Sequence, residues 1–563
     1  MAAGRYRSGS RATQGNEEWM DTIVLILVML LAVVASGYLV RVIPIPLPLP
    51  LVQIAMGAVV SGIFNHGVTL DPDIFFLLFL PPLLFFDGWR IPKDGLFRDR
   101  NTIVELALGL VLFTMIGMGF MIHWLIPAMP LAVAFALAAI VSPTDPVAVS
   151  SITERVPMPR RLMHILGGES LLNDASGLVC FRFAITAALT GTFSLTSATV
   201  TFFWVAIVGI CTGIALTFFV SFVQRTLIRR FGEESGSSIL LNLLIPFGAY
   251  LLAERADASG ILAAVAAGIT MSYVELSGRT HASTRVNRTA VWDMLQFALN
   301  GIVFVLLGEQ LPTILHGAAW SVMETGHLNP WWLAVYALAI SGGLIVLRFL
   351  WVWLSLRLTL FKAHFRGEKF VQPHWRLVLA TSLAGVRGAI TLAGVLTLPL
   401  MMPNGDPFPQ RDVTIFLATS VILVSLVVAS IGLPQVLRGL RFPEDSSSWQ
   451  EEDRARHAAA RAAIDAINSI SRDASMEADD ANAYSQSLAH VIGLYQHRLD
   501  QHHPDGGKTR HARKVDEIER DLRLAGMQAE REEIFNMARR GEISDQTSRK
   551  LVREIDLLES RYR

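Results

Sequence analysis

Four polar side chains interrupt the apolar stretch at residues 161–189, namely Glu169, Ser170, Asn173 and Asp174. In a helix, Ser170 and Asp174 lie on one face because they are about one turn apart. Glu169 and Asn173 form a second pair of this kind, about 100° round the helix. A carboxylate with a hydroxyl group one turn away offers hard oxygen ligands for a small cation, and the same carboxylate can instead hold a proton. Because packing between membrane helices does not require two carboxylates, the pattern favours an ion or proton site over a hydrogen-bond cluster.

A second candidate site lies at residues 142–146, whose sequence is Ser-Pro-Thr-Asp-Pro. The two prolines remove backbone donors and clash with the preceding turn, so the sequence predicts a broken helix. The break would free carbonyl groups such as that of Thr144, and unwound backbone of this kind coordinates ions in transporters. Asp145 would then face the positive end of the second half-helix, which favours a negative charge there.

An arginine takes the corresponding place in a later apolar stretch, where Arg387 lies between Gly385 and Gly388. Glycine permits unwinding and a close approach of backbones, and Arg387 can neutralise the carbonyl end of a broken helix. Two interrupted helices at corresponding places in two halves of a chain point to a transporter with inverted repeats. The two breaks lie about seven spans apart, which predicts about six plus six helices joined by a seventh, with the two broken helices crossed.

Two further arginines lie within apolar stretches, Arg348 and Arg182. A charge in the middle of a membrane costs at least about 2.5–3.5 kcal/mol on insertion scales, so Arg348 needs a partner, and Glu169 is the best candidate. A buried pair of this kind contributes specificity more than net stability. Arg182 lies about 12 Å along the helix from Asp174 and could extend outward to the interface, so we assign it no role.

The elements that must hold these residues are membrane helices, because the composition disfavours most other classes. Of the 563 residues, 52% are hydrophobic and only 17% are charged, against about 25% in an average soluble protein. This argues against a soluble enzyme, a disordered protein and a nucleic-acid binder. We predict an all-α polytopic membrane protein with an N-terminal tail at 1–20, a transmembrane domain at 21–440 and an α-helical cytoplasmic tail at 441–563. About thirteen apolar stretches are long enough to be membrane helices, at 22–40, 49–64, 72–89, 102–126, 130–152, 161–189, 198–224, 237–253, 258–275, 289–311, 331–356, 374–400 and 411–434.

Basic residues in the loops predict the orientation of the chain in the membrane. Cytoplasmic loops carry excess Lys and Arg, and here alternate loops are basic, whereas the intervening loops contain only Arg255 and Arg411. The pattern predicts a multi-pass protein of the cell membrane with its N-terminus outside and its C-terminus in the cytoplasm. Arg5, Arg7 and Arg11 at the N-terminus oppose this orientation. A count of twelve helices would follow if the first span were processed.

The tail at 441–563 has the pattern of amphipathic helices. Apolar residues recur on one helical face in two segments, Val515, Ile518, Leu522 and Ala525 in the first and Leu551, Val552, Ile555 and Leu558 in the second. Ser544 or Asp545 could cap the last helix, and residues 502–507 form a break. We expect a small helical bundle or an interaction arm whose partner is unknown. The histidines of the tail could report cytosolic pH, although ordinary exposed histidines are the better explanation.

At these residues the chain resembles the Na⁺/H⁺ exchanger family, the electroneutral branch of the monovalent cation:proton antiporters. The resemblance is carried by PPLLFFDGW (81–89), SPTDPVAV (142–149), GGESLLNDASG (167–177), GILAAVAAG (260–268) and GVRGAITLAG (385–394). These motifs occur in family order and extend over about 20–434, and together they are highly specific. The chain is most similar to bacterial members with a helical cytoplasmic tail.

The resemblance implies a role for each residue of the candidate ion site. Asp174 would bind the cation or the proton, and Asn173 before it marks the electroneutral branch. Ser170 and the carbonyl group of Thr144 would be further ligands of the transported monovalent cation. Asp145 would act directly or through a water molecule.

The resemblance also implies supporting residues and an assembly. Glu169 and Arg348 would form an ion pair beside the site, and Arg387 would compensate the crossed broken helices. The family is dimeric, so we expect a homodimer surrounded by membrane lipid. Spans near the first to third and the seventh to tenth would form the dimer domain, and the remaining spans would form a moving core.

Competition for one carboxylate is the mechanism that these expectations support. Asp174 would hold either a proton or a monovalent cation (Na⁺, or else Li⁺ or K⁺), and the core would carry it across the membrane by alternating access. We expect electroneutral 1:1 exchange driven by ion gradients, with no cofactor, no enzymatic activity and no nucleic-acid partner. In agreement, the sequence has no apparent P-loop, zinc pattern or catalytic triad. The alternatives are a K⁺-selective cation/H⁺ antiporter and a passive cation channel, which needs a continuous pore rather than one isolated site.

Overall fold

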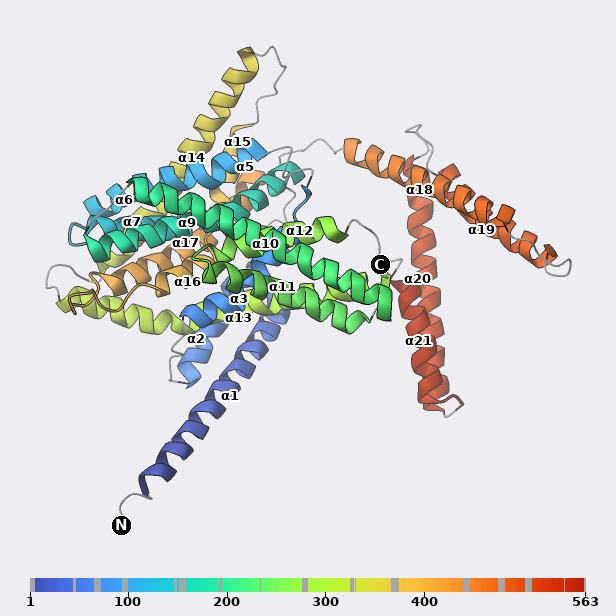
Figure 1. Cartoon of the computed structure of the whole chain (residues 1–563), viewed down its shortest axis with the longest axis horizontal. Coiled ribbons are helices and arrows are strands. Elements are labelled where there is room, and N and C mark those ends of the chain that lie inside the picture. The colour runs from blue at the N-terminus through green and yellow to red at the C-terminus, as the bar shows by residue number, and fades with distance from the viewer. Residues whose placement is uncertain are drawn as a thin grey trace. The chain divides into compact units, whose positions relative to one another are not determined.

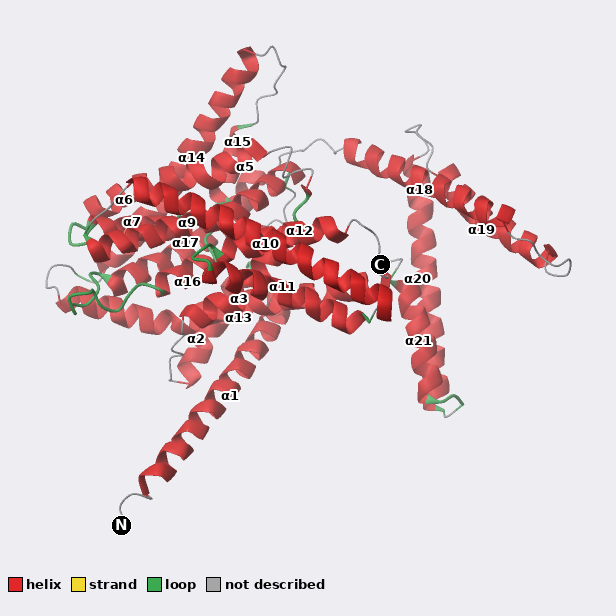
Figure 2. Cartoon of the chain, in the orientation of Figure 1, coloured by secondary structure: helices red, strands yellow, loops and turns green. Residues whose placement is uncertain are grey.

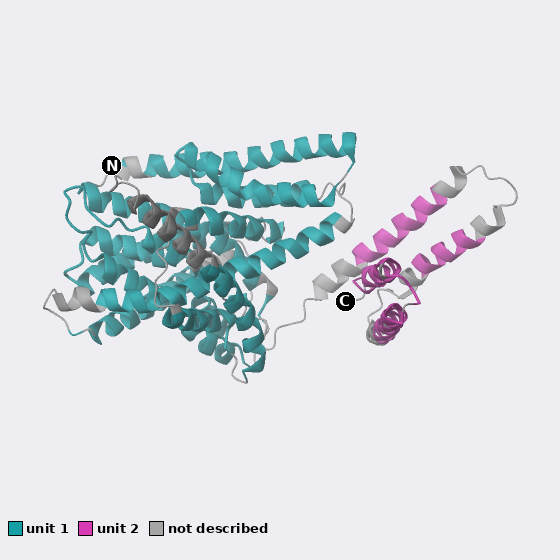
Figure 3. Cartoon of the chain, turned by 90° about the horizontal axis from the view of Figure 1, so that it is seen from below, with its two compact units in different colours: residues 1–440 teal, residues 441–563 magenta. Residues whose placement is uncertain are grey.

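The structure is a computed structural model that describes residues 6–43, 47–64, 72–93, 100–145, 149–150, 158–191, 195–232, 234–275, 282–324, 329, 331–365, 374–438, 446–473, 481–501, 509–540 and 542–560. Within these residues it is helical, with no strand and one isolated bridge between Met401 and Pro407 (Figure 2). The predicted all-α fold is therefore confirmed. The chain forms two compact units, residues 1–440 and 441–563 (Figure 3).

The helices of the first unit match the predicted apolar stretches, each of which contains one helix or consecutive helical segments where the structure describes it (Figure 1). Their bounds are α1 (Tyr6–Val42), α2 (Leu49–Phe64), α3 (Pro72–Arg90), α5 (Arg100–Val104), η1 (Glu105–Leu110), α6 (Val111–Leu125), α7 (Leu131–Val141), α9 (Arg160–Thr190), α10 (Leu195–Phe231), α11 (Ser235–Arg255), α12 (Gly260–Glu275), α13 (Ala282–Glu324), α14 (Trp331–Phe365), α15 (Trp375–Leu383), α16 (Ala389–Leu396) and α17 (Arg411–Leu437). One difference is that α1 already begins at Tyr6, inside the predicted N-terminal tail. Part of the stretch 130–152 lies outside the described residues.

Length and composition make this unit a multi-pass membrane domain. Among the described residues, eight helices are long and apolar enough to cross a membrane, and α2, α7 and α12 are shorter apolar helices. Large apolar side chains are exposed along them, such as Phe203 and Phe222 on α10 and Ile116 on α6. A soluble surface rarely exposes so much contiguous apolar area, whereas lipid solvates it. The number of spans, about thirteen from the sequence, stays a prediction.

Close helix contacts fix α3 and α13, which both contribute to the site described below. At Gly308 of α13 a Cβ atom would overlap the carbonyl oxygen of Ile54 in α2, so only glycine permits this approach. Nearer the N-terminal end of α13, the buried Trp292 stacks on Phe85 and Phe86 of α3. The ring centroids are 5.3 and 5.5 Å apart. Stacked aromatic rings bury large areas with a defined geometry. The register of α3 against α13 is therefore fixed.

The second unit contains two helix pairs, α18 (Ser446–Asp473) with α19 (Ala481–Gln501) and α20 (Thr509–Arg539) with α21 (Asp545–Glu559). Ser544 caps α21, and its hydroxyl oxygen accepts a hydrogen bond from the Thr547 N–H at 3.2 Å, as one of the two predicted caps. Arg531 of α20 contacts Glu559 and lies 2.7 Å from Asp556, both on α21. These contacts raise the pKa of the Arg531 guanidinium above its ordinary value. The hydrogen bond to Glu559 is the largest cause, and the hydrogen bond to Asp556 contributes as well.

One predicted apolar face of the tail is not covered within the described residues of this unit. Ile555 of α21 is buried, but Ile518 and Leu522 of α20 are 51% and 68% exposed. The reason is length, because α21 has 15 residues and α20 has 31, and α21 packs beside the part of α20 that carries Arg531. The predicted break at residues 502–507 lies outside the described residues.

Candidate ion-binding site

Two broken helices cross at the centre of the first unit, as the prolines and glycines predict. One chain segment leaves α7 at Val141 and is non-helical through Asp145, and the other leaves α15 at Leu383 and enters α16 at Ala389. The Asp145 N–H donates a 2.7 Å hydrogen bond to the carbonyl oxygen of Val386, so the two breaks are joined directly. A backbone group freed by one break therefore satisfies a group freed by the other.

Arg387 occupies this crossing and compensates the carbonyl groups that the breaks leave. Its Nε donates to the carbonyl oxygen of Val141 at 2.9 Å, and its Nη1 donates to that of Gly385. Its own N–H donates to the Ser425 hydroxyl at 3.1 Å, and the side chain is buried. A guanidinium group at the carbonyl end of a helix stabilises the end of the helix dipole. Arg387 thus contacts one carbonyl group from each break, and its compensating role in transport stays a prediction.

The second buried arginine, Arg348 of α14, forms a two-pronged ion pair with Glu169 of α9. The two nitrogen–oxygen distances are 2.6 and 2.8 Å, and both side chains are buried. Arg348 Nε also donates to the Thr381 carbonyl oxygen at 3.1 Å. This planar geometry suits guanidinium and carboxylate groups and fixes both of them. The predicted pairing of Glu169 with Arg348 is therefore what the structure shows.

The hydroxyl group of Thr144 links the ion pair to the broken helix. It donates to Glu169 at 3.3 Å and accepts from the Asn173 side-chain amide at 3.0 Å. The Thr144 hydroxyl is thus engaged with two protein partners, and the predicted role of the Thr144 carbonyl group as a cation ligand stays a prediction. Glu169 and Asn173 thus hold the broken segment, whereas the other predicted pair on α9, Ser170 and Asp174, lines a cavity.

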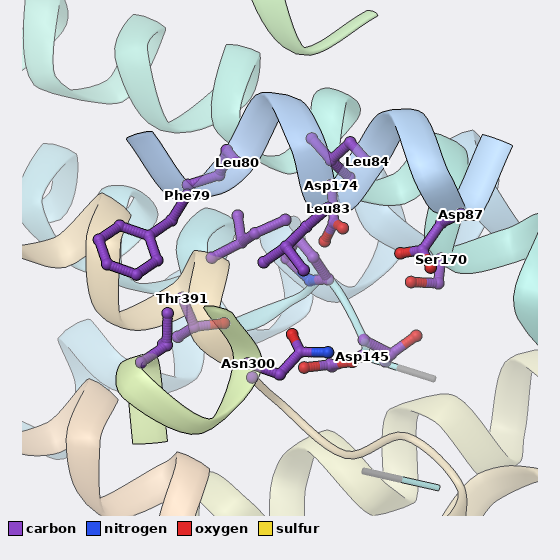
Figure 4. A pocket seen from close by; sticks show the side chains of 15 residues that line it. Phe79, Leu80, Leu83, Leu84, Asp87, Asp145, Ser170, Asp174, Asn300 and Thr391 are labelled. Atoms are coloured by element: carbon purple, nitrogen blue, oxygen red, sulfur yellow. The ribbon is translucent and has the colours of Figure 1, made fainter. Parts of the chain in front are cut away.

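That cavity has a volume of about 40 Å³ and is lined by residues from several elements of the unit. It is lined by Asp174 and Ser170 of α9, Thr144 and Asp145 of the first break, Asp87 and Leu84 of α3, Asn300 of α13, Gly388 of the second break and Thr391 of α16, together with apolar side chains. Figure 4 shows the side chains of Asp174, Asp145 and Asp87 arranged around the same space. A cavity needs about 10–15 Å³ of volume to hold one water molecule, so this cavity has room for only a few. The cavity therefore admits a small cation only after most of its hydration shell has been removed.

Asp87 and Asn300 are site residues that the sequence analysis did not identify. Asp87 lies in the apolar run of 81–89, which supported only the family resemblance, and its position near the end of a span gave no sign of a site. Asn300 lies in the long apolar stretch of α13 without any motif. Both reach the cavity because α3 and α13 pack beside the broken helices. The useful signal would have been that Asp87 is the one carboxylate within the run 81–89.

Arg182, the other membrane arginine, is placed away from the cavity. It is mostly exposed, and its guanidinium group lies 3.8 Å from Glu254, at the end of α11. An exposed pair of this kind contributes about 0–1 kcal/mol. The pair connects α9 to α11 but adds no group to the site.

Gly388 leaves the space that the Asp145 carboxyl group occupies, because a Cβ atom at this position would overlap Asp145 Oδ2. We expect Gly388→Ala to lower the rate of transport by at least about tenfold, since a displacement of about 1 Å can cost up to 10²-fold. Gly342→Ala on α14 is the matched control, because its new Cβ would have no neighbour within 4 Å. Measured rates in proteoliposomes test this, and equal rates for the two variants would show that the close approach is unimportant.

Comparisons with known proteins agree with the resemblance seen in the motifs. A family model described as "Sodium/hydrogen exchanger, transmembrane" matches residues 26–439. The chain is 40% identical to the uncharacterized Na(+)/H(+) exchanger YjcE of Escherichia coli (strain K12), over 96% of this chain and 99% of that protein. It is 37% identical to a protein of Bacillus subtilis (strain 168) named sodium, potassium, lithium and rubidium/H(+) antiporter, over 96% of this chain and 78% of that protein.

A solved structure has the same fold. The sodium proton antiporter MjNhaP1 of Methanocaldococcus jannaschii superposes with a TM-score of 0.57 at 18% sequence identity. The superposition covers 75% of this chain and 99% of that protein. At this identity the likeness concerns the arrangement of helices alone.

Proposed function

Because the chain belongs to the sodium/hydrogen exchanger family, we propose that it is a secondary antiporter that exchanges Na⁺ or a related monovalent cation for H⁺ across the cell membrane. The observation that carries the proposal is the small cavity at the crossing of the two broken helices, lined by Asp174, Asp145 and Asp87. Carboxylates inside a membrane domain are costly and mark ion or proton pathways. The same family membership supports transport rather than enzymatic catalysis.

Competition between cation and proton follows from the charges around this cavity. Three carboxylates facing one small space repel each other when all are ionised, and either a bound cation or a proton reduces that repulsion. The ligands of the cation would be the Asp174 carboxylate, the Ser170 hydroxyl and the Thr144 carbonyl group, with Asp145 and Asp87 acting directly or through water. Oxygen ligands of this kind replace the water that a hard cation loses. Exchange then needs only the two ion gradients, and we propose that no cofactor takes part.

Alternating access is supported by the origin of the residues around the cavity. Asp174 and Asp145 come from α9 and the segment after α7, which pack on each other, whereas Asp87 and Asn300 come from α3 and α13. Movement of one group of helices against the other would expose the cavity to opposite sides of the membrane in turn. We propose that this happens in a homodimer with the N-terminus outside and the C-terminal tail in the cytoplasm, at an electroneutral 1:1 stoichiometry.

A broader cation preference is the second candidate. The Bacillus subtilis relative is named for sodium, potassium, lithium and rubidium, and the oxygen ligands described here do not by themselves distinguish these ions. K⁺/H⁺ exchange at the same site is therefore the second candidate function, and the same flux experiment tests both. A passive channel is disfavoured, because the carboxylates gather at one small cavity, whereas a channel needs a continuous pore.

Cation-driven proton movement in proteoliposomes tests the proposal. We expect saturable H⁺ flux with Na⁺, and the series Li⁺, K⁺ and Rb⁺ gives the selectivity. Lowering the pH on the side of the cation should raise the apparent KM for the cation while the maximal rate at saturating cation changes little, because both ions compete for one site. Cation flux without opposite proton flux, or flux that does not saturate, would exclude exchange and indicate a channel.

A further inference from the structure

A second and wider cavity, of about 600 Å³, adjoins the ion site. We call it the vestibule. Asp87 and Asn300 line both cavities, so the vestibule ends at the candidate site. The other charged or titratable groups that line it are Arg90 of α3, His164 of α9 and Asp293 of α13. The side chains of Arg90 and Asp293 are more than half exposed, so the vestibule reaches solvent at this end of the helices.

Arg90 is an unexpected side chain on a path for cations, because its positive charge repels them. It is also one helical turn from Asp87, with which it could pair directly on the same face of α3. The structure shows a different arrangement. Arg90 Nη1 lies 3.7 Å from Asp293 Oδ1 and 3.4 Å from Gln296 Oε1, and its guanidinium group lies over the ring of Phe86.

Gln296 separates the two charges of α3. Its amide oxygen accepts from Arg90, and its amide nitrogen donates to Asp87 Oδ1 at 3.4 Å. Gln296 and Asp293 are themselves one turn apart on α13, so both can reach Arg90, and Gln296 also reaches Asp87. The four side chains form a chain of contacts, from Asp293 to Arg90, from Arg90 to Gln296 and from Gln296 to Asp87, in which Asp293 neutralises Arg90 and Gln296 orients Asp87.

Two other basic side chains lie at this end of α3 and α13, and their partners do not line the vestibule. Lys93 donates to the Ser272 carbonyl oxygen at 2.7 Å and lies over the ring of Tyr273. Arg288 is buried and pairs with Glu275 of α12. Among the described residues that line the vestibule, Arg90 is therefore the Lys or Arg whose charge an entering cation meets.

We propose that Asp293 and Gln296 are positioning residues that hold Arg90 away from Asp87 and cancel its charge, so that cations can enter the vestibule and reach the ion site. The inference rests on the proposed exchange function and adds a determinant of apparent cation affinity to it. Neither side chain needs to contact the cation. Their effect is exerted through Arg90.

The test compares apparent KM and maximal rate for Na⁺ in proteoliposomes or everted vesicles. Asp293→Asn leaves the charge of Arg90 uncompensated, and we expect an apparent KM about three- to tenfold higher with a maximal rate within about twofold of the unmodified protein. Arg90→Gln combined with Asp293→Asn should restore the KM to within about twofold. Asp293→Glu keeps the negative charge, so its KM should also lie within about twofold of that of the unmodified protein. Glu234→Gln is the matched control, since Glu234 is exposed and does not line the vestibule.

Ionic strength separates this electrostatic effect from a structural one. Choline chloride added at constant Na⁺ should shrink the KM difference between Asp293→Asn and the unmodified protein, because the Debye length falls to about 8 Å at 0.15 M salt. An unchanged KM in Asp293→Asn, or a double variant no better than the single one, would overturn the proposal. If Asp293→Asn does not fold, Arg90→Gln alone decides, because the proposal requires an equal or lower KM and a higher one refutes it. Absence of exchange in the unmodified protein would instead refute the proposed function.

Discussion

Asp174→Asn is expected to abolish cation-dependent proton flux while the protein still folds. The substitution keeps the size of the side chain and removes its charge at a buried position. A unit charge about 4 Å from a bound cation is worth about 4 kcal/mol at an effective dielectric constant near 20. Its loss therefore lowers cation affinity by about a thousandfold, since each 1.4 kcal/mol is about tenfold. The variant also loses the carboxyl group that would carry the proton in the opposite direction.

The measurement is Na⁺-driven proton flux in proteoliposomes, together with gel filtration and thermal unfolding of the purified variant in detergent. Asp406→Asn is the matched control, because Asp406 is exposed in the turn before α17 and hydrogen-bonds to Asn404. It carries the same chemical change and should retain the exchange rate. Exchange that persists in Asp174→Asn would remove this carboxylate from the mechanism and move attention to Asp87 and Asp145.

The broken helices could be predicted from sequence because proline and glycine act on the backbone at their own positions. Pro143 removes a donor and ends α7 wherever the rest of the chain lies. The glycines around Arg387 act in the same local way. The pairing of Glu169 with Arg348 was also accessible, since a membrane arginine requires a nearby negative charge and the chain offers few. Each of these inferences needs only the type of residue at a position and the free energy that this residue costs there.

The second half of the site could not be predicted, because it depends on which helices lie side by side. Asp87 belongs to the site since α3 packs beside the broken helices, and Asn300 since α13 packs on α3. The sequence pattern of neither segment indicates which helix packs beside it. The same limit applies to Arg182, whose contact with Glu254 joins helices distant in sequence. In the tail, the exposed Ile518 shows that an amphipathic pattern marks a face without naming what covers it.

Arg348→Met is expected to destabilise the membrane unit strongly, because it leaves the Glu169 carboxylate buried without its guanidinium partner. Removing one member of a buried pair costs about 3–5 kcal/mol, whereas replacing both members by uncharged groups is often close to neutral. We therefore expect Arg348→Met to lower the free energy of unfolding by about that amount. The double variant Glu169→Gln with Arg348→Met should regain most of the loss.

Unfolding in detergent, followed by heat or denaturant, measures the three variants of this cycle against the unmodified protein. Glu169 also accepts from the Thr144 hydroxyl, which holds the broken segment beside Asp145. The amide oxygen that Glu169→Gln introduces can still accept that hydrogen bond, so the double variant should keep the site in place and retain part of the exchange activity. If the double variant is as unstable as Arg348→Met, the pair itself, rather than relief of one unpaired charge, stabilises the crossing of the broken helices.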